Sequence, residues 1–171
     1  MSDILQNIKV VVTVTDSAGT ALVGASVSLS PVASGSTGKT VSDGTCTLIV
    51  PYGTYTAGAS MTGFVTASGV AISDGNATCT LNTVTGNGII KATATGTASA
   101  NLAGAKVTAT PSSGTTVTGT TNSSGVAAIS AVAKSYSVVA SMSGYSDSSS
   151  QTALVTSGGS VSLSLGLTKN D

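Results

Sequence analysis

The chain has 171 residues with six lysines, six aspartates and no net charge, and only 7% of its residues are charged, against about 25% in an ordinary soluble domain. Histidine, arginine, glutamate and tryptophan are absent, so there is no imidazole for a nucleophilic pair or a metal, and no arginine cluster for phosphates. This composition argues against an enzyme, against a cofactor or metal site, and against nucleic-acid binding.

The beginning of the chain lacks the features of a targeting segment. Met1–Asn7 has no basic region, and the apolar stretch Ile8–Val14 is interrupted by Lys9 and Thr13. No apolar run approaches the roughly 18 residues that a membrane span needs. We therefore expect synthesis in the cytoplasm without a signal peptide and without a membrane span.

Alternating apolar and polar residues recur along the whole chain, which is the pattern of strands with one buried face. Turn-forming residues separate these segments, for example Asp16–Gly19, Pro51–Gly53 and Asp74–Asn76. The pattern predicts an all-β protein made of antiparallel β-sandwiches. The clearest predicted strands are Val10–Val14, Ala25–Leu29, Thr45–Val50, Thr54–Ala59 and Val161–Leu165.

Two parts of the sequence resemble each other at a spacing of 80 or 81 residues. Leu22–Val27 corresponds to Leu102–Val107, and Ala59–Phe64 corresponds to Ala140–Tyr145. Four such blocks occur in the same order, which indicates a tandem of two similar domains. We predict one domain at 1–86, with a short lead at 1–7, and a second at 87–171.

The first copy resembles the carboxypeptidase regulatory-like domain, which is a transthyretin-like, Ig-like sandwich. The resemblance rests on Val12–Gly19, Leu22–Val27, Asp43–Tyr55 with its Pro-x-Gly-x-Tyr motif, and Gly63-Phe64. The second copy has Val132-Ala-Lys134 in place of the Pro-Gly pair, so its resemblance is weaker. The resemblance implies an accessory module without catalytic residues, of the kind found in enzymes, surface adhesins and phage virion proteins.

Two short motifs suggest chemistry but favour ordinary turns. Ala33–Thr40 differs by one residue from a phosphate-binding loop, and Ser36 and Lys39 have the spacing of a Ser-x-x-Lys nucleophile motif. Both motifs require a helix, and the sequence predicts a hairpin loop instead. Isolated aspartates at Asp16, Asp43 and Asp74 are likewise expected to form turns and not a calcium site.

Two pairs of residues are candidates for crosslinks. Lys9 and Asn82 lie near the first and last strands of the first copy, where related sandwiches form a Lys–Asn isopeptide bond, although the sequence has no glutamate to assist it. Cys46 and Cys79 lie on alternation positions that face the core. Buried free thiols are the favoured interpretation, and an intramolecular or intermolecular disulfide is the alternative.

Repetition of aromatic residues between the two copies favours core or corner packing over a ligand platform. The aromatic residues are Tyr52, Tyr55, Phe64, Tyr136 and Tyr145.

The sequence therefore favours a non-enzymatic structural protein of a bacteriophage virion, first of all a decoration protein on the capsid surface. Its partners would be other virion proteins, such as major capsid or tail proteins, and copies of itself, with weak contact to host-surface glycans. The alternatives are a tail, neck or fibre component, or an extracellular cell-surface module that binds glycans or a receptor. Low charge suits subunits that remain packed in an assembly.

Overall fold

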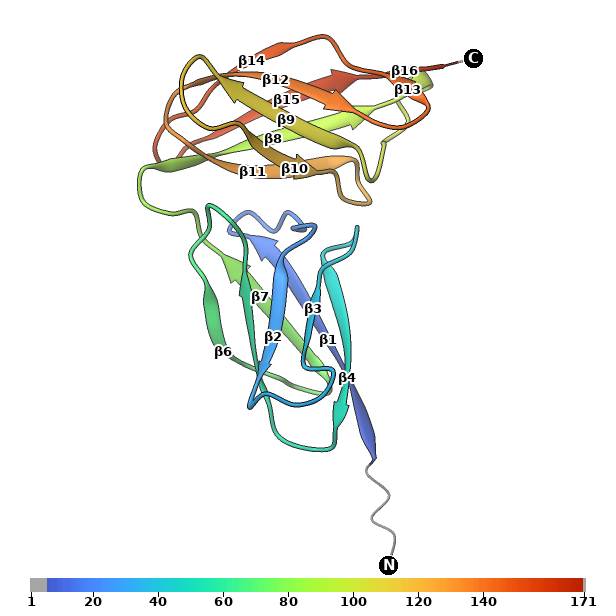
Figure 1. Ribbon diagram of the computed structural model, residues 1–171, viewed down its shortest axis with the longest axis vertical. Coiled ribbons are helices and arrows are strands. Elements are labelled where there is room, and N and C mark those ends of the chain that lie inside the picture. The colour runs from blue at the N-terminus through green and yellow to red at the C-terminus, as the bar shows by residue number, and fades with distance from the viewer. Residues whose placement is uncertain (1–5, 171) are drawn as a thin grey trace, which may run out of the picture. The chain divides into compact units, whose positions relative to one another are not determined.

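The computed structural model describes residues 6–170 and divides the chain into two compact units (Figure 1). The chain up to Met61, together with Val65–Asn82, forms the first unit. Thr62–Phe64, together with the chain from Thr83, forms the second unit. The limits predicted from the sequence, 1–86 and 87–171, remain a prediction.

The first unit consists of two sheets that enclose its core. One sheet has three strands, with β1 in the centre, and the other has four strands, with β2 and β5 in the centre. Their orders are β4 (Thr45–Pro51), β1 (Asn7–Asp16), β7 (Asn76–Leu81), and β3 (Thr37–Lys39), β2 (Ser26–Ser30), β5 (Thr56–Ser60), β6 (Ala67–Ala71).

The second unit also has one three-stranded and one four-stranded sheet, and in addition a two-stranded ribbon near its end. A short turn, Thr97–Ser99, with left-handed backbone at Ala98 follows its first strand. The strand orders are β11 (Val126–Val132), β8 (Asn87–Thr95), β15 (Ser160–Gly166); β10 (Val117–Thr120), β9 (Lys106–Pro111), β12 (Ser135–Ser141), β14 (Gln151–Leu154); and β13 (Tyr145–Ser146) with β16 (Thr168–Lys169).

The prediction of an all-β sandwich fold is confirmed. Most strand pairs are antiparallel, but in each unit the first strand is flanked by the last long strand in parallel, β7 beside β1 and β15 beside β8. A parallel pair requires the chain to cross from one sheet to the other between the two strands. The sequence did not indicate these parallel pairs, because alternation reports which face is buried and not which strand lies alongside.

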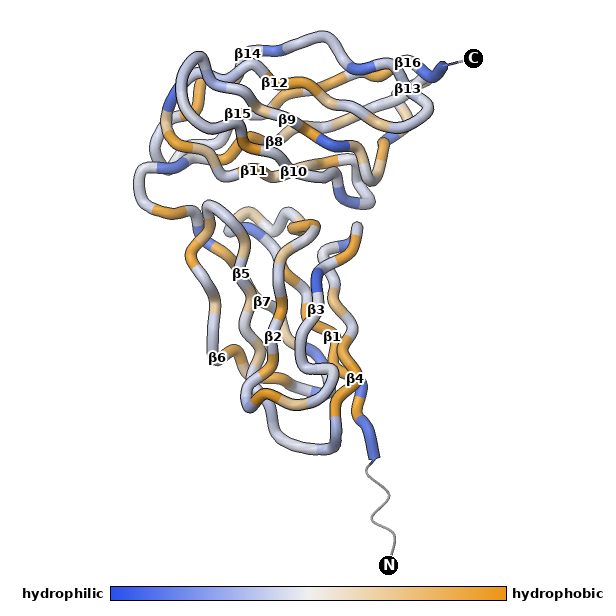
Figure 2. Tube along the Cα trace, viewed as in Figure 1, coloured by the Kyte–Doolittle hydropathy of each residue, from blue (hydrophilic) through white to orange (hydrophobic). Residues whose placement is uncertain are grey.

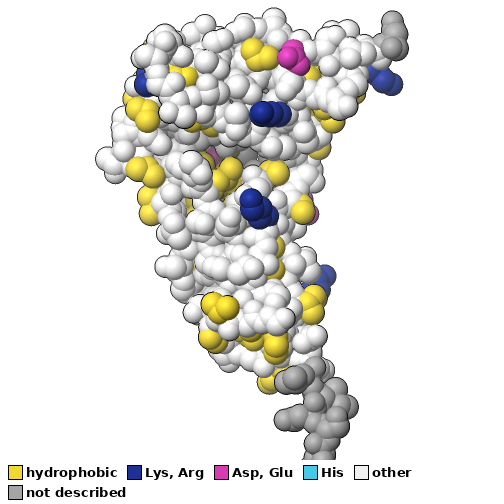
Figure 3. Space-filling model, in the orientation of Figure 1, with side chains coloured by type: hydrophobic (Ala, Val, Ile, Leu, Met, Phe, Trp, Pro, Cys, Tyr) yellow, Lys and Arg dark blue, Asp and Glu magenta, His cyan; other side chains and the backbone are white. Residues whose placement is uncertain are grey.

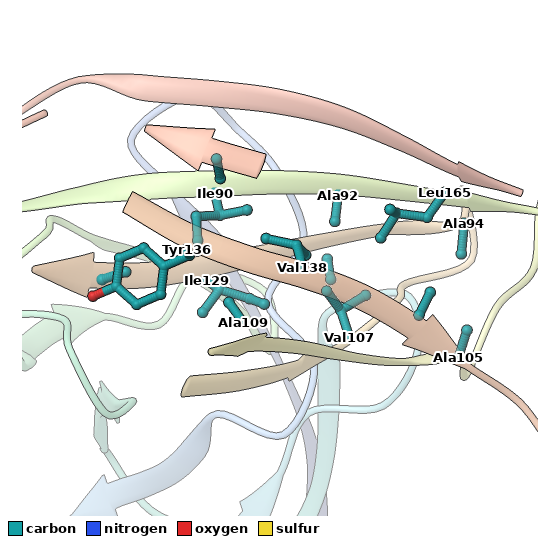
Figure 4. Close-up of a cluster of buried hydrophobic side chains, with 14 of the residues drawn as sticks. Ile90, Ala92, Ala94, Ala105, Val107, Ala109, Ile129, Tyr136, Val138 and Leu165 are labelled. Carbon is teal, nitrogen blue, oxygen red and sulfur yellow. The ribbon is translucent and has the colours of Figure 1, made fainter. Parts of the chain in front are cut away.

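Alternation places small and medium aliphatic side chains in the interior of each unit. Figure 2 shows the hydrophobic residues interspersed with hydrophilic ones along the chain. In the second unit the cluster contains many alanines beside Ile90, Val107, Val138 and Leu165 (Figure 4). In the first unit the fully buried side chains come from both sheets: Val10, Val12, Val14, Leu22, Leu29, Val50 and Leu81. Cores of such small residues depend on close approach of the sheets, because each side chain contributes little apolar area.

The two units share one buried hydrogen-bonded arrangement. In the first, the Thr40 hydroxyl donates to the Leu22 carbonyl oxygen at 2.5 Å and accepts the Ala25 amide at 3.0 Å. In the second, the Thr121 hydroxyl donates to the carbonyl oxygen of Leu102 at 2.5 Å and accepts the amide of Ala105 at 2.8 Å. These residues are 80 or 81 positions apart, so the repeat in the sequence corresponds to a repeat in hydrogen bonding.

Two tyrosines form equivalent corners. The Tyr55 hydroxyl donates to the Pro51 carbonyl oxygen at 3.0 Å, and the Tyr136 hydroxyl donates to that of Val132 at 3.1 Å. Burial raises the pKa of the Tyr136 hydroxyl above its usual value. The prediction of core or corner packing is confirmed for these residues.

Of the other three aromatic residues, Phe64 is buried and Tyr145 is partly buried, as predicted. The prediction is wrong for Tyr52, whose side chain is 79% exposed. Tyr52 follows the end of β4 in the turn before β5, where no facing sheet covers it.

The turn after β8 contains two adjacent non-glycine residues with positive φ, Ala98 at 57° and Ser99 at 60°. Left-handed backbone costs about 1 kcal/mol or more for a residue with a side chain. Replacing Ser99 by glycine is therefore expected to raise the free energy of unfolding by about 0.5–1 kcal/mol, measured by urea denaturation. Thr97→Gly, at a position without positive φ, is the control and should not stabilise the protein.

Candidate functional site

The three isolated aspartates of the first unit act in turns. The carboxylate of Asp16 accepts the amides of Ala18 and Thr20, at 2.9 and 2.7 Å. Asp43 accepts the hydroxyl and the amide of Thr45, and these bonds lower the pKa of its carboxyl group. Asp74 has a φ of 49° in the tight turn before β7. The prediction of turn formation is confirmed.

The stretch that resembles a phosphate-binding loop is a hairpin. Residues 31–36 form a loop, and residues 37–39 form strand β3, so no helix N-terminus faces a phosphate here. Gly35 has a φ of 75° and lies against the Ile49 carbonyl group, so it is needed for a close backbone contact. Ser36 is buried, and its hydroxyl accepts the Ala33 amide at 3.1 Å. Its role is therefore to hold the loop.

The structure separates Lys9 from Asn82, so the isopeptide alternative is wrong. Lys9 lies near the start of β1, opposite Ile49 of β4. Asn82 follows Leu81, which pairs with Asp16 at the other end of β1. Since β1 and β7 are parallel and a strand rises about 3.3 Å per residue, eight residues separate the two side chains by about 26 Å along the sheet.

Cys46 and Cys79 are both buried and free, as predicted. Cys46 lies on β4 opposite Val12, and Cys79 lies on β7 opposite Val14. They thus flank the central strand β1 on its two sides with an offset of two residues, which places their Cα atoms about 12 Å apart. A disulfide requires Cα atoms within about 7 Å, so the fold does not allow an intramolecular bond.

Burial raises the pKa of both thiols, because the apolar surroundings disfavour the thiolate. We expect two thiols per chain to react with a thiol reagent after unfolding, and neither to react quickly in the folded protein. If protein that is unfolded without a reducing agent shows no reactive thiol, the cysteines are not free and the described arrangement is contradicted.

The same raised pKa makes stability depend on pH. In the unfolded chain the thiols have a pKa of about 8.5, so they ionise at a lower pH than the buried thiols of the folded protein. The free energy of unfolding is therefore unaffected by the thiols below about pH 8.5 and decreases as the pH rises from there through the higher pKa values of the folded state. Urea unfolding at pH 7 and pH 9.5 should show a decline that is smaller in the Cys46→Ala, Cys79→Ala variant.

Residues 6–170 contain no group of three or more acidic, histidine or cysteine side chains arranged to hold a metal ion. Within the same part of the chain, no helix has the length and apolar character needed to cross a membrane.

Each unit has a shallow groove on the outer face of its four-stranded sheet. In the first unit the groove has a volume of about 510 Å³, and its lining includes four residues with hydroxyl groups and Lys39. In the second unit a smaller groove of about 320 Å³ is lined by Thr110, Pro111, Ser112, Ser135, Tyr136, Ser137 and Thr152. The sequence pattern did not indicate either groove, because each is assembled from residues of several strands.

The described surface is mostly uncharged and carries several exposed apolar side chains. In the view of Figure 3, hydrophobic side chains appear in scattered small groups and few charged side chains are visible. The largest exposed fractions of aliphatic side chains are 85% for Val32 and 68% for Leu154. Ile49, next to the loop that contains Val32, is also half exposed.

Comparison with known families gives one match. Residues 89–168, slightly less than half of the chain, match the carboxypeptidase regulatory-like domain. The match lies in the second unit, whereas the motifs in the sequence indicated the stronger resemblance in the first. It therefore does not depend on the Pro-x-Gly-x-Tyr motif. No curated protein matches the sequence.

Several solved structures are similar at low sequence identity, among them three bacterial proteins. The TIE protein of Bacillus anthracis is 17% identical with a TM-score of 0.43, covering 94% of this chain and 34% of that protein. The shaft pilin SpaA of Lactobacillus rhamnosus GG is 13% identical with a TM-score of 0.39, covering 97% and 99%. The minor pilin GBS52 of Streptococcus agalactiae is 13% identical with a TM-score of 0.41, covering 95% and 96%. The chain thus spans about a third of the length of the TIE protein.

Proposed function

We propose that the chain consists of two copies of one carboxypeptidase regulatory-like module and is a non-enzymatic structural protein of a bacteriophage virion. Duplication is supported by the matching strand orders of the two units and by the equivalent hydrogen bonds of Thr40 and Thr121. It is also supported by the equivalent corners of Tyr55 and Tyr136. Within the virion, we place the protein on the outer capsid surface as a decoration subunit.

The observation that carries this proposal is the nature of the surface. A chain with only 7% charged residues exposes Val32, Tyr52 and Leu154 by more than two thirds each. Exposed apolar groups on a surface with few charges are suited to contact with other proteins, where their area is removed from water. The partners would be capsid proteins and further copies of this chain. Many weak contacts gain strength when symmetry repeats them.

Mass spectrometry of purified virions tests the proposal. We expect the protein in many copies per particle, and gold-labelled antibodies against it should decorate the capsid in electron micrographs. Label on the tail, neck or fibres would move the protein to another part of the virion. Absence from virions, with recovery in the cell-envelope or secreted fraction, would overturn the virion proposal in favour of a cell-surface module.

A further inference from the structure

The groove of the first unit lies over three adjacent strands, β3, β2 and β5. Its volume of about 510 Å³ falls within the range of about 300–1,000 Å³ that is typical of small-ligand sites. The groove is shallow and open to solvent, and carbon atoms contribute more of its surface than polar atoms do. Its lining residues are Ser26, Val27, Ser28, Thr37, Gly38, Lys39 and Ser60.

The register of the strands aligns three of these polar groups in one row. Ser26 of β2 lies directly opposite Lys39 of β3 on one side and Ser60 of β5 on the other. Directly opposed residues have Cβ atoms about 4.5–5.5 Å apart. A second row follows two residues along the strands, where Ser28 lies opposite Thr37. The inward residue Val27 is buried, so the groove floor rests on the core.

Polar groups in this groove are available to a ligand. Within residues 6–170, the hydroxyl groups of Ser26, Ser28, Thr37 and Ser60 make no hydrogen bond, and Lys39 makes no ion pair. Each hydroxyl can both donate and accept a hydrogen bond, and the ammonium group of Lys39 donates and carries a positive charge. None of the lining residues is acidic.

We propose that this groove binds an acidic saccharide, a sugar unit that carries a carboxylate. The sugar hydroxyls match the serine and threonine hydroxyls, which can exchange donor and acceptor roles. Its carboxylate matches the ammonium group of Lys39 in a charge-assisted hydrogen bond. This inference concerns the first unit alone and does not depend on the assignment to a virion.

The second unit provides an internal comparison. In the equivalent row, Lys106 of β9 stands at the position of Ser26 and lies opposite Thr120 and Ser141, but it does not line that unit's groove. That groove contains no charged residue, and its Ser137 hydroxyl is already bonded to the Ser150 hydroxyl at 2.6 Å. The two units therefore differ in whether a lysine lines the groove, since Lys39 does so in the first unit and Lys106 does not in the second.

The test is a titration of the full chain with trigalacturonic acid, followed by the backbone amide signals in NMR spectra. We expect saturable shifts at residues 26–28, 37–39 and 60, with a Kd of about 1–10 mM. Lys39→Gln is expected to raise the Kd by about three- to fivefold, since an exposed ion pair contributes little. Lys106→Gln, the matched control, should leave the Kd unchanged.

The methyl ester of the same trisaccharide serves as the uncharged probe. We expect it to bind more weakly than the acid, by a factor similar to that of Lys39→Gln. Equal binding of acid and ester would overturn the role of the carboxylate. Shifts located outside the groove, or no saturable shift, would overturn the site itself.

Discussion

Replacing Leu165 by alanine is expected to lower the free energy of unfolding of the second unit by about 2–5 kcal/mol. Leu165 is completely buried on β15, in the cluster that also contains Ile90, Val107 and Val138 (Figure 4). Many of its neighbours are alanines with short side chains, which cannot move into the space that the leucine leaves. The loss therefore includes the cost of a cavity in addition to the lost apolar burial.

Hydrogen exchange read by mass spectrometry measures this effect in each unit separately. Peptides from β8, β12 and β15 should lose protection in the Leu165→Ala variant. Leu154→Ala is the matched control in the same unit, because the Leu154 side chain is 68% exposed, and it should change stability by no more than about 0.5 kcal/mol. A loss below 1 kcal/mol for Leu165→Ala would contradict the described core.

Replacing Thr121 by valine is expected to cost about 2–4 kcal/mol, although the two side chains have nearly the same shape. The Thr121 hydroxyl is buried and satisfies both the Leu102 carbonyl and the Ala105 amide. Valine leaves these two backbone groups without a partner inside the protein, and each unsatisfied group costs about 1–3 kcal/mol. Thr40→Val should have a similar effect in the first unit, where the same bonds occur.

Urea denaturation measures the effect, with two variants for comparison. Thr118→Val lies on the exposed face of β10 and should be nearly neutral, because its hydroxyl is not buried. Thr121→Ser retains the hydroxyl and should lose less stability than Thr121→Val. If the serine and valine variants were equally unstable, the hydrogen bonds would not explain the contribution of Thr121 to stability.

The sequence alone determined the class of fold and the positions of most strands. Strict alternation in β1, β4 and β15 reports a buried and an exposed face, because successive side chains on a strand point to opposite sides. The same reasoning predicted that Cys46 and Cys79 face the core, and Asp-Gly and Pro-Gly pairs marked the turns. These are local properties, for which neighbouring residues carry sufficient information.

Only the tertiary structure decided which strands lie side by side. The parallel pairing of β1 with β7 separates Lys9 from Asn82 and places the two cysteines on opposite sides of β1. Register across β3, β2 and β5 brings Lys39, Ser26 and Ser60 into one row. An alternating sequence is compatible with any strand partner, and with any register, that keeps its apolar face toward the core. The choice among them depends on how the whole sandwich packs, which no local pattern records.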